Sequence, residues 1–157
     1  MDYTKVLESG SFCQVGFVVN DVDKAKKVYA ALFGVEVPPT VDGGEYEVNQ
    51  CRVYGEPAPE AGCRMAFINM SPGVQLELIE PNSAHSVWRD ELVRLGEGIH
   101  HIAFQVKDTD AAVKELSEKY GAVVEQRGFY GDGSGQYTYL NVQDALKCRI
   151  ELLESFR

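Results

Sequence analysis

The sequence predicts an α+β fold in which a strand–helix–strand–strand–strand unit, βαβββ, occurs twice. When the chain is shifted by 87 residues, the segment 14–37 falls on 101–124 with eight identical pairs and no gap. Farther along, VQLELIE at 74–80 resembles CRIELLE at 148–154. Each half begins with an apolar or alternating strand and continues with apolar residues at helical spacing. Two modules of the same kind therefore make up the chain.

The length of 157 residues and a hydrophobic content of 45% suit one compact domain with a sizeable core. We expect a single domain over 1–157, with a first module at about 10–81, a linker helix at about 82–96 and a second module at about 97–157.

The first strand of each module is expected at roughly 12–19 and 98–106, and a helix should follow it. An aspartate stands at the N-cap of each helix and a glycine at its C-cap, where a positive φ is needed. The expected helix ends are, in chain order, Asp21, Gly34, Asp108 and Gly121.

Three further strands should follow in each module, and "SPG" at 71–73 is a hairpin turn between two of them. The linker helix should be capped by Asn82 or Ser83. The six expected strands are 45–54, 63–70, 73–80, 122–130, 135–142 and 147–154.

Charge and composition exclude several classes of function. The net charge of −9 and the sequence pI of about 4.8 disfavour nucleic acid and anionic membranes as partners. No apolar run is long enough to span a membrane and no secretory signal is seen, so we expect a cytoplasmic protein. The cysteines form no C-x-x-C pair and are expected to be buried, reduced thiols: Cys13, Cys51, Cys63 and Cys148.

The stretch GIHHIAFQV places two histidines side by side in a strand, where neighbouring side chains point to opposite faces. His100 shares its face with Ile102 and Phe104, which predicts a core or edge histidine. His101 shares its face with small and polar residues, which suits a concave inner surface.

Four polar residues related by the repeat are expected on that inner face. Glu77 and Glu151 each lie between buried aliphatic residues in the closing strand of a module, and Gln14 is the repeat counterpart of His101. Together they form an oxygen and nitrogen set suited to Zn²⁺, Ni²⁺, Co²⁺, Mn²⁺ or Fe²⁺. The alternative is that the glutamates lie on the solvent face of an open sheet and His101 is an isolated polar residue.

At this point the sequence resembles the vicinal oxygen chelate superfamily, which includes glyoxalase I, methylmalonyl-CoA epimerases, extradiol dioxygenases and bleomycin-resistance proteins. The resemblance rests on the paired modules, on "GIHHIAFQVKDTDAA" and on the strands "LELIEP" and "IELLE", and it covers nearly the whole chain. It implies eight strands in an open half-barrel around a divalent metal. The metal ligands carried over are Gln14, Glu77, His101 and Glu151.

The chain departs from individual branches of that superfamily. The order Gln-Glu-His-Glu resembles zinc-type glyoxalase I, yet its glutathione-binding residues fall here on Val18, Pro81 and Glu97. The glutamate base of methylmalonyl-CoA epimerases falls on Met65. Extradiol dioxygenases need two histidines and a carboxylate, and only His101 is in place.

The resemblance therefore implies a metal-dependent lyase, isomerase or epimerase that moves a proton on a carbon next to a carbonyl. Glu151 is the first choice of base and Glu77 the second. The expected substrate-binding residues are Arg149, Tyr137, Tyr139, Met65 and Phe67. The tyrosines act either as acid or orienting donors or as lining aromatics, and Arg149 either meets an anionic substrate or neutralises the glutamates.

Two alternatives come from other classes of protein: a binding protein that sequesters a small molecule without catalysis, and a scaffold that uses its acidic surface. The four competent metal-ligand positions favour the enzyme, and the scaffold leaves the two inward glutamates unexplained. The glycine-rich segment 127–139 is either a mobile lid or an ordinary hairpin loop. The expected partner is a small-molecule substrate, and the resemblance also allows a homodimer.

Overall fold

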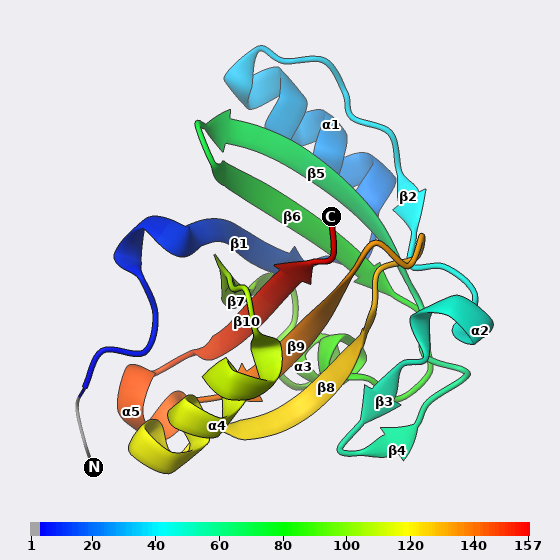
Figure 1. Ribbon diagram of the computed structural model, residues 1–157. Coiled ribbons are helices and arrows are strands. Elements are labelled where there is room, and N and C mark those ends of the chain that lie inside the picture. The colour runs from blue at the N-terminus through cyan, green and yellow to red at the C-terminus, as the bar shows by residue number, and fades with distance from the viewer. Residues whose placement is uncertain (1–3) are drawn as a thin grey trace.

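The computed structural model describes residues 4–157 and contains one ten-stranded sheet that curls into an open half-barrel (Figure 1). The α+β fold predicted from the sequence is confirmed. The elements in chain order are η1 (Ser9–Ser11), β1 (Phe12–Val18), α1 (Val22–Phe33), β2 (Val41–Asp42), α2 (Tyr46–Asn49), β3 (Arg52–Val53), β4 (Glu56–Pro57), β5 (Cys63–Ser71), β6 (Val74–Pro81), α3 (Val87–Leu95), β7 (Gly98–Gln105), α4 (Thr109–Tyr120), β8 (Val123–Phe129), β9 (Gly135–Asn141), α5 (Gln143–Leu146) and β10 (Arg149–Ser155).

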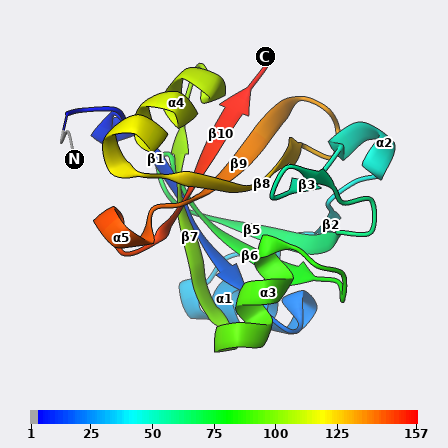
Figure 2. The same ribbon diagram turned by 90° about the horizontal axis from the view of Figure 1, so that it is seen from below.

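The strand order is β2-β5-β6-β1-β7-β10-β9-β8-β3-β4, so the two modules join at the pair β1–β7. β1 runs parallel to β6 and antiparallel to β7, and β7 runs parallel to β10. Helix α1 packs on β5 and β6, and α4 packs on β10. Figure 2 shows the two halves of the sheet diverging from this central seam. Four strands therefore meet at the centre, two from each module.

The two long helices begin and end where the sequence predicts. The Asp21 side chain accepts a hydrogen bond from the backbone N–H of Lys24 at 2.9 Å, and Asp108 caps α4 in the same way. Gly34 and Gly121 follow the helices in the left-handed conformation, with φ of 66° and 71°. The "SPG" turn also joins β5 to β6 as expected.

The prediction of a strand at 45–54 is wrong, and the sheet of the described residues has ten strands rather than the expected eight. That segment forms the short helix α2, followed by the two-residue strands β3 and β4. Gln50 and Tyr54 have positive φ values of 46° and 49°, which interrupt an extended strand. β3 then pairs with β8 of the other module, so the internal repeat breaks down here.

The linker helix is also shorter than expected. Its N-cap is Ser86, whose side chain accepts from the N–H of Arg89 at 2.9 Å, and neither Asn82 nor Ser83 caps it. Asn82 instead holds the preceding turn, because its Oδ1 accepts from the N–H of Ala84.

No helix within residues 4–157 is long and apolar enough to cross a membrane. All four cysteines are free thiols. Cys51 and Cys63 are buried as expected, whereas Cys13 and Cys148 are only partly buried.

Candidate functional site

The structure brings Gln14, Glu77, His101 and Glu151 together at the centre of the sheet. They lie on β1, β6, β7 and β10, the four adjacent central strands. Each of the four residues is at most 5% exposed. The alternative in which the glutamates face solvent is therefore wrong.

Two small residues make room for these side chains. Gly16 pairs with Glu77 on one side and His101 on the other, and Ala103 pairs with Gln14 and Glu151. A Cβ on Gly16 would lie 2.0 Å from Cε1 of His101, so only glycine leaves space for that ring. Because Gly16 and Ala103 are repeat counterparts, both halves of the site are built in the same way.

Four electron-pair acceptors converge on one point. His101 Nε2 lies 2.9 Å from Glu151 Oε2, 3.3 Å from Glu77 Oε2 and 3.2 Å from Gln14 Oε1. The Gln14 amide also lies 3.1 and 3.0 Å from the two carboxylates. Ligands at zinc bond lengths of about 2.0–2.2 Å in a tetrahedron stand roughly 3.3–3.6 Å apart. The four groups therefore fit a divalent cation after a small expansion.

The Gln14 amide has two possible orientations. With its oxygen toward the cluster, it faces two carboxylate oxygens, which is repulsive unless a cation lies among them. Turned by 180°, the amide would instead donate from its nitrogen to Glu77 and Glu151. The same side chain can thus serve the site with or without a cation.

Burial and charge together set the protonation of this cluster. Burial raises the pKa of Glu77, and the nearby Glu151 charge raises it further against the opposing effect of His101. Burial alone would lower the pKa of His101, but Glu151 and Glu77 outweigh it and raise that pKa to about 9. Without a cation, His101 is therefore protonated at neutral pH and compensates part of the carboxylate charge.

The two adjacent histidines do not point to opposite faces, contrary to the alternation of a regular strand. Gly16 pairs with His101 and Phe17 pairs with Ile99, so His100 is the extra residue of a β-bulge. The rings of His100 and His101 meet edge to face, and their Nδ1 atoms lie 2.9 Å apart. His100 is buried beside the site rather than under the helix that follows β7.

This contact orients the His101 ring. His100 Nε2 lies 3.1 Å from the carbonyl oxygen of Val87, which can only accept a hydrogen. His100 therefore donates from Nε2 and accepts at Nδ1 from the Nδ1–H of His101. With Nδ1–H held by His100, the proton that a cation would displace is the one on Nε2 of His101, and the electron pair freed in this way is directed at Gln14, Glu77 and Glu151. Burial, and secondly the charge of His101, hold the pKa of His100 well below its usual value. The His100 ring is therefore neutral, as this series of hydrogen bonds requires.

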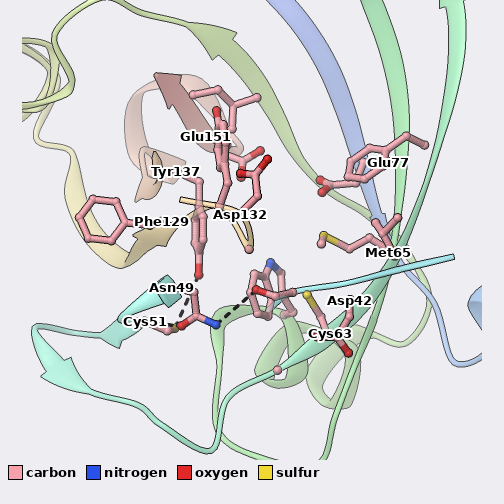
Figure 3. Close-up of a pocket in the computed structure, with 18 of the residues that line it drawn as sticks. Asp42, Asn49, Cys51, Cys63, Met65, Glu77, Phe129, Asp132, Tyr137 and Glu151 are labelled. Atoms are coloured by element: carbon pink, nitrogen blue, oxygen red, sulfur yellow. Dashed lines mark hydrogen bonds between the residues drawn. The ribbon is translucent and has the colours of Figure 1, made fainter. Parts of the chain in front are cut away.

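A cavity of about 630 Å³ opens beside the cluster (Figure 3). Of the expected substrate-binding residues, Met65, Phe67, Tyr137 and Tyr139 line it. Arg149 does not line it: its Nε lies 2.8 Å from Glu125 and its Nη1 lies 3.7 Å from Glu91. The arginine therefore neutralises glutamates other than Glu77 and Glu151.

Sequence reasoning missed much of the cavity wall. Trp88 comes from α3 and donates from Nε1 to the Tyr139 hydroxyl at 2.9 Å. Asn49 and Cys51 come from the segment wrongly expected as a strand, whose β3 pairs with β8 of the second module. Asp42 comes from β2, which pairs with β5. The lining residues that were not predicted to bind substrate include Asp42, Asn49, Cys51, Cys63, Trp88, Tyr130 and Asp132.

Two loops, here called the mouth loops, lie across the cavity: 42–44, which begins at the end of β2, and 130–134, between β8 and β9. They touch through bare backbone, since a Cβ on Gly44 would lie 2.6 Å from the Cα of Gly131. The glycine-rich segment 127–139 is mostly the β8–β9 hairpin, and its loop is held by backbone hydrogen bonds such as Tyr130 N–H to Gly135 O at 2.9 Å.

A curled sheet built from a repeated module, with a buried Gln–Glu–His–Glu cluster beside a cavity, defines a class of small-molecule proteins with a candidate cation site. Residues 13–139 match the Glyoxalase/Bleomycin resistance protein/Dioxygenase superfamily, and the chain belongs to it.

Several relatives of this chain are methylmalonyl-CoA epimerases. The chain is 25% identical to the mitochondrial methylmalonyl-CoA epimerase of Bos taurus and 28% identical to that of Homo sapiens, in each case over 91% of this chain and 73% of the relative. A methylmalonyl-CoA epimerase variant of Streptomyces coelicolor, solved with 2-nitronate-propionyl-CoA, superposes with a TM-score of 0.64 at 28% identity, covering 94% of this chain and 98% of that one.

Proposed function

We infer that this chain is a divalent-metal-dependent epimerase, isomerase or lyase that moves a proton on a carbon next to a carbonyl. The observation that carries this proposal is the convergence of four buried acceptor groups beside a cavity, in a chain similar to methylmalonyl-CoA epimerases. A divalent cation held by Gln14, Glu77, His101 and Glu151 would supply positive charge that stabilises the enolate oxygen of the substrate.

The two glutamates are the groups that can take and return the proton. Both line the cavity, and they come from opposite modules, so they approach a bound substrate from different directions. Glu151 is the first candidate for the base. Glu77 is the second, and burial raises the pKa of its carboxyl above the usual value.

Met65 stands where the superfamily's epimerases are expected to carry a glutamate, so the base is assigned to this pair of glutamates, which are the buried carboxylates of the cavity. Met65 lines the cavity but cannot exchange a proton. The hydroxyls of Tyr137 and Tyr139 serve as orienting groups, since burial raises both of their pKa values well above the usual one and they stay protonated.

Proton exchange with solvent tests the proposal directly. A panel of hydroxyketones and acyl thioesters incubated in D₂O with the Zn²⁺- or Co²⁺-supplemented protein should show deuterium uptake at the carbon next to the carbonyl. Glu151→Gln should lower the exchange rate by about 10²-fold or more, as expected for loss of a general base. Glu118→Gln, at an exposed position on α4, is the matched control and should leave the rate unchanged.

Because Glu151 is also a proposed metal ligand, the metal content of each variant must be measured in the same samples. Loss of exchange with metal retained supports a role as base. Tight ligand binding without exchange in any metal-loaded sample would instead favour the sequestering protein, and exchange that is equal in Glu151→Gln, Glu77→Gln and the unaltered protein would exclude both glutamates as the base.

A further inference from the structure

The charge of the cavity restricts what can enter it. Among residues 4–157, no lysine, arginine or histidine lines the cavity. Its charged lining residues are all acidic: Asp42, Glu77, Asp132 and Glu151. A bound divalent cation offsets the charge of the two glutamates. Asp42 and Asp132 keep their charges. Hydrogen bonds from Ser134 lower the pKa of Asp132, and Arg157, which does not line the cavity, helps to lower it and offsets part of the Asp132 charge.

Two arginines that neighbour cavity residues in the sequence are paired with acidic residues outside the cavity. Arg149 is paired with Glu125 and Glu91, as described above. Arg64, on the strand that carries Met65, instead forms ion pairs with Asp23 and Glu80. Neither is among the residues that line the cavity.

The two aspartates stand on the mouth loops and line the cavity. Both are exposed, so they lie at its open side, and each accepts a hydrogen bond from its own loop: Asp42 from the N–H of Gly44 at 2.8 Å and Asp132 from the N–H of Ser134 at 2.9 Å. These bonds restrain the two carboxylates.

The rest of the wall is largely apolar and aromatic. Trp88, Phe129 and Tyr137 contribute rings, and Met65 and Cys63 contribute sulfur (Figure 3). Away from the proposed cation, which the carbonyl oxygen would occupy, a carboxylate or phosphate on a bound molecule would lose its hydration without gaining a cationic side chain, which is unfavourable. An uncharged apolar body would gain contact area instead.

We propose that the substrate of this site is an uncharged carbonyl compound with an apolar or aromatic body, and that the acidic mouth excludes anionic compounds such as acyl-CoA thioesters. Only one part of this proposal, that the substrate carries a carbonyl group, rests on the proposed function. The volume of about 630 Å³ lies within the usual range for pockets that enclose a drug-sized molecule, roughly 300–1,000 Å³.

Trp88 provides a readout of binding that is independent of catalysis. It is the single tryptophan of the chain and it lines the cavity. Its fluorescence, excited at wavelengths where aliphatic ligands do not absorb, should change when the cavity fills.

Two matched pairs of probes separate charge from shape. The first pair is 1-cyclohexyl-2-hydroxyethanone and hexahydromandelate, which share the ring and differ chiefly in a carboxylate. The second is S-propionyl-N-acetylcysteamine and propionyl-CoA, which share the thioester and differ in the phosphates. With one equivalent of Zn²⁺ present, we expect each neutral probe to bind at least ten times more tightly than its anionic partner.

Removing the negative charges of Asp42 and Asp132 should reduce the difference in affinity between the neutral and the anionic probes. Asp42→Asn and Asp132→Asn keep the side-chain oxygen that accepts from the loop backbone, so the loops should stay in place. Together they should tighten binding of the anionic probes several-fold and leave the neutral probes unchanged. Asp144→Asn, an exposed acid on α5 outside the cavity, is the control and should change neither.

Equal or tighter binding of hexahydromandelate or propionyl-CoA than of the neutral partners would overturn the proposal, as would an Asp42→Asn/Asp132→Asn double variant with unchanged selectivity. The outcome is distinguishable from a failure of the proposed function. Neutral binding without deuterium exchange contradicts only the proton chemistry, and exchange with an anionic substrate contradicts only the charge selection.

Discussion

His100 is predicted to control metal binding although it is not one of the four converging ligands. Its Nδ1 lies 2.9 Å from Nδ1 of His101, and its Nε2 lies 3.1 Å from the Val87 carbonyl oxygen. His100→Phe keeps a ring of similar shape but removes both nitrogens. His101 is 1% exposed, so its Nδ1–H then has neither His100 nor solvent as an acceptor. The tautomer that carries its proton on Nδ1 and leaves Nε2 for a metal is no longer favoured.

The expected size follows from these two lost hydrogen bonds. A buried unsatisfied donor costs about 1–3 kcal/mol, and loss of a partner that orients a metal-ligating histidine typically lowers metal affinity about 10–100-fold. We therefore expect Zn²⁺ affinity to fall by roughly 10–100-fold in His100→Phe. The strictly alternating strand predicted from the sequence would have given a packing effect only.

Competition with a chromophoric chelator measures the Zn²⁺ affinity, and urea unfolding of the metal-free proteins measures stability separately. His100→Asn is the matched variant, because its Oδ1 can accept near the position of the original Nδ1 and should restore much of the affinity. If His100→Phe binds Zn²⁺ within about threefold of the unaltered protein, the ring contact does not orient His101 and the reasoning fails.

Three further predictions follow from the same geometry. Gly16→Ala should destabilise the protein by about 2–4 kcal/mol and abolish tight Zn²⁺ binding, because the added Cβ would lie 2.0 Å from the His101 ring. Urea unfolding and Zn²⁺ titration check this, and a variant of normal stability that binds a full equivalent of Zn²⁺ would contradict it. Zn²⁺ affinity should rise about tenfold per pH unit between pH 7 and 8.5 with release of about one proton, because the pKa of His101 is raised to about 9 and its proton competes with the metal below that pH; calorimetry in buffers of different ionisation enthalpy measures it, and affinity independent of pH would refute it. Gly44→Ala should push the mouth loops apart, because its Cβ would lie 2.6 Å from the Gly131 Cα, and should raise KM more than it lowers kcat; an unchanged KM would show that the loop contact does not retain substrate.

Local signals in the sequence were sufficient for most of the fold. The caps at Asp21 and Asp108 act within one helical turn, and the glycines that end the helices adopt the left-handed conformation regardless of distant contacts. The prediction for the segment 45–54 failed because the structure of this segment depends on pairing with β8, which is distant in the chain. Alternation along a segment cannot reveal such a partner.

The same distinction explains the site. Period-2 alternation placed Glu77 and Glu151 on one face, and the repeat made Gln14 the counterpart of His101. The residues alone left a solvent-facing alternative open, and the resemblance to the superfamily favoured the convergence of the four. The position of His100 did not, because a bulge is determined by the register between two strands. Trp88 was missed for a related reason: its direction depends on how α3 lies against the sheet, and no periodic pattern encodes that.

The bulge is itself part of the repeat. Cys13, the repeat counterpart of His100, is the extra residue of a second bulge in the same β1–β7 pair, between Phe12 and Gln14. The β1–β7 pair is therefore symmetric down to its irregularities, while its chemistry is not. One bulge holds the histidine that contacts His101, and the other holds a thiol whose Sγ lies 3.5 Å from the Ala103 carbonyl oxygen. The amide of Gln14 is neutral and can turn, whereas the imidazole of His101 is fixed by its neighbour. His101 of the second module is thus the more rigid member of the pair and Gln14 of the first module the more adaptable one, which would suit the proposed role of holding a cation while a substrate oxygen approaches it.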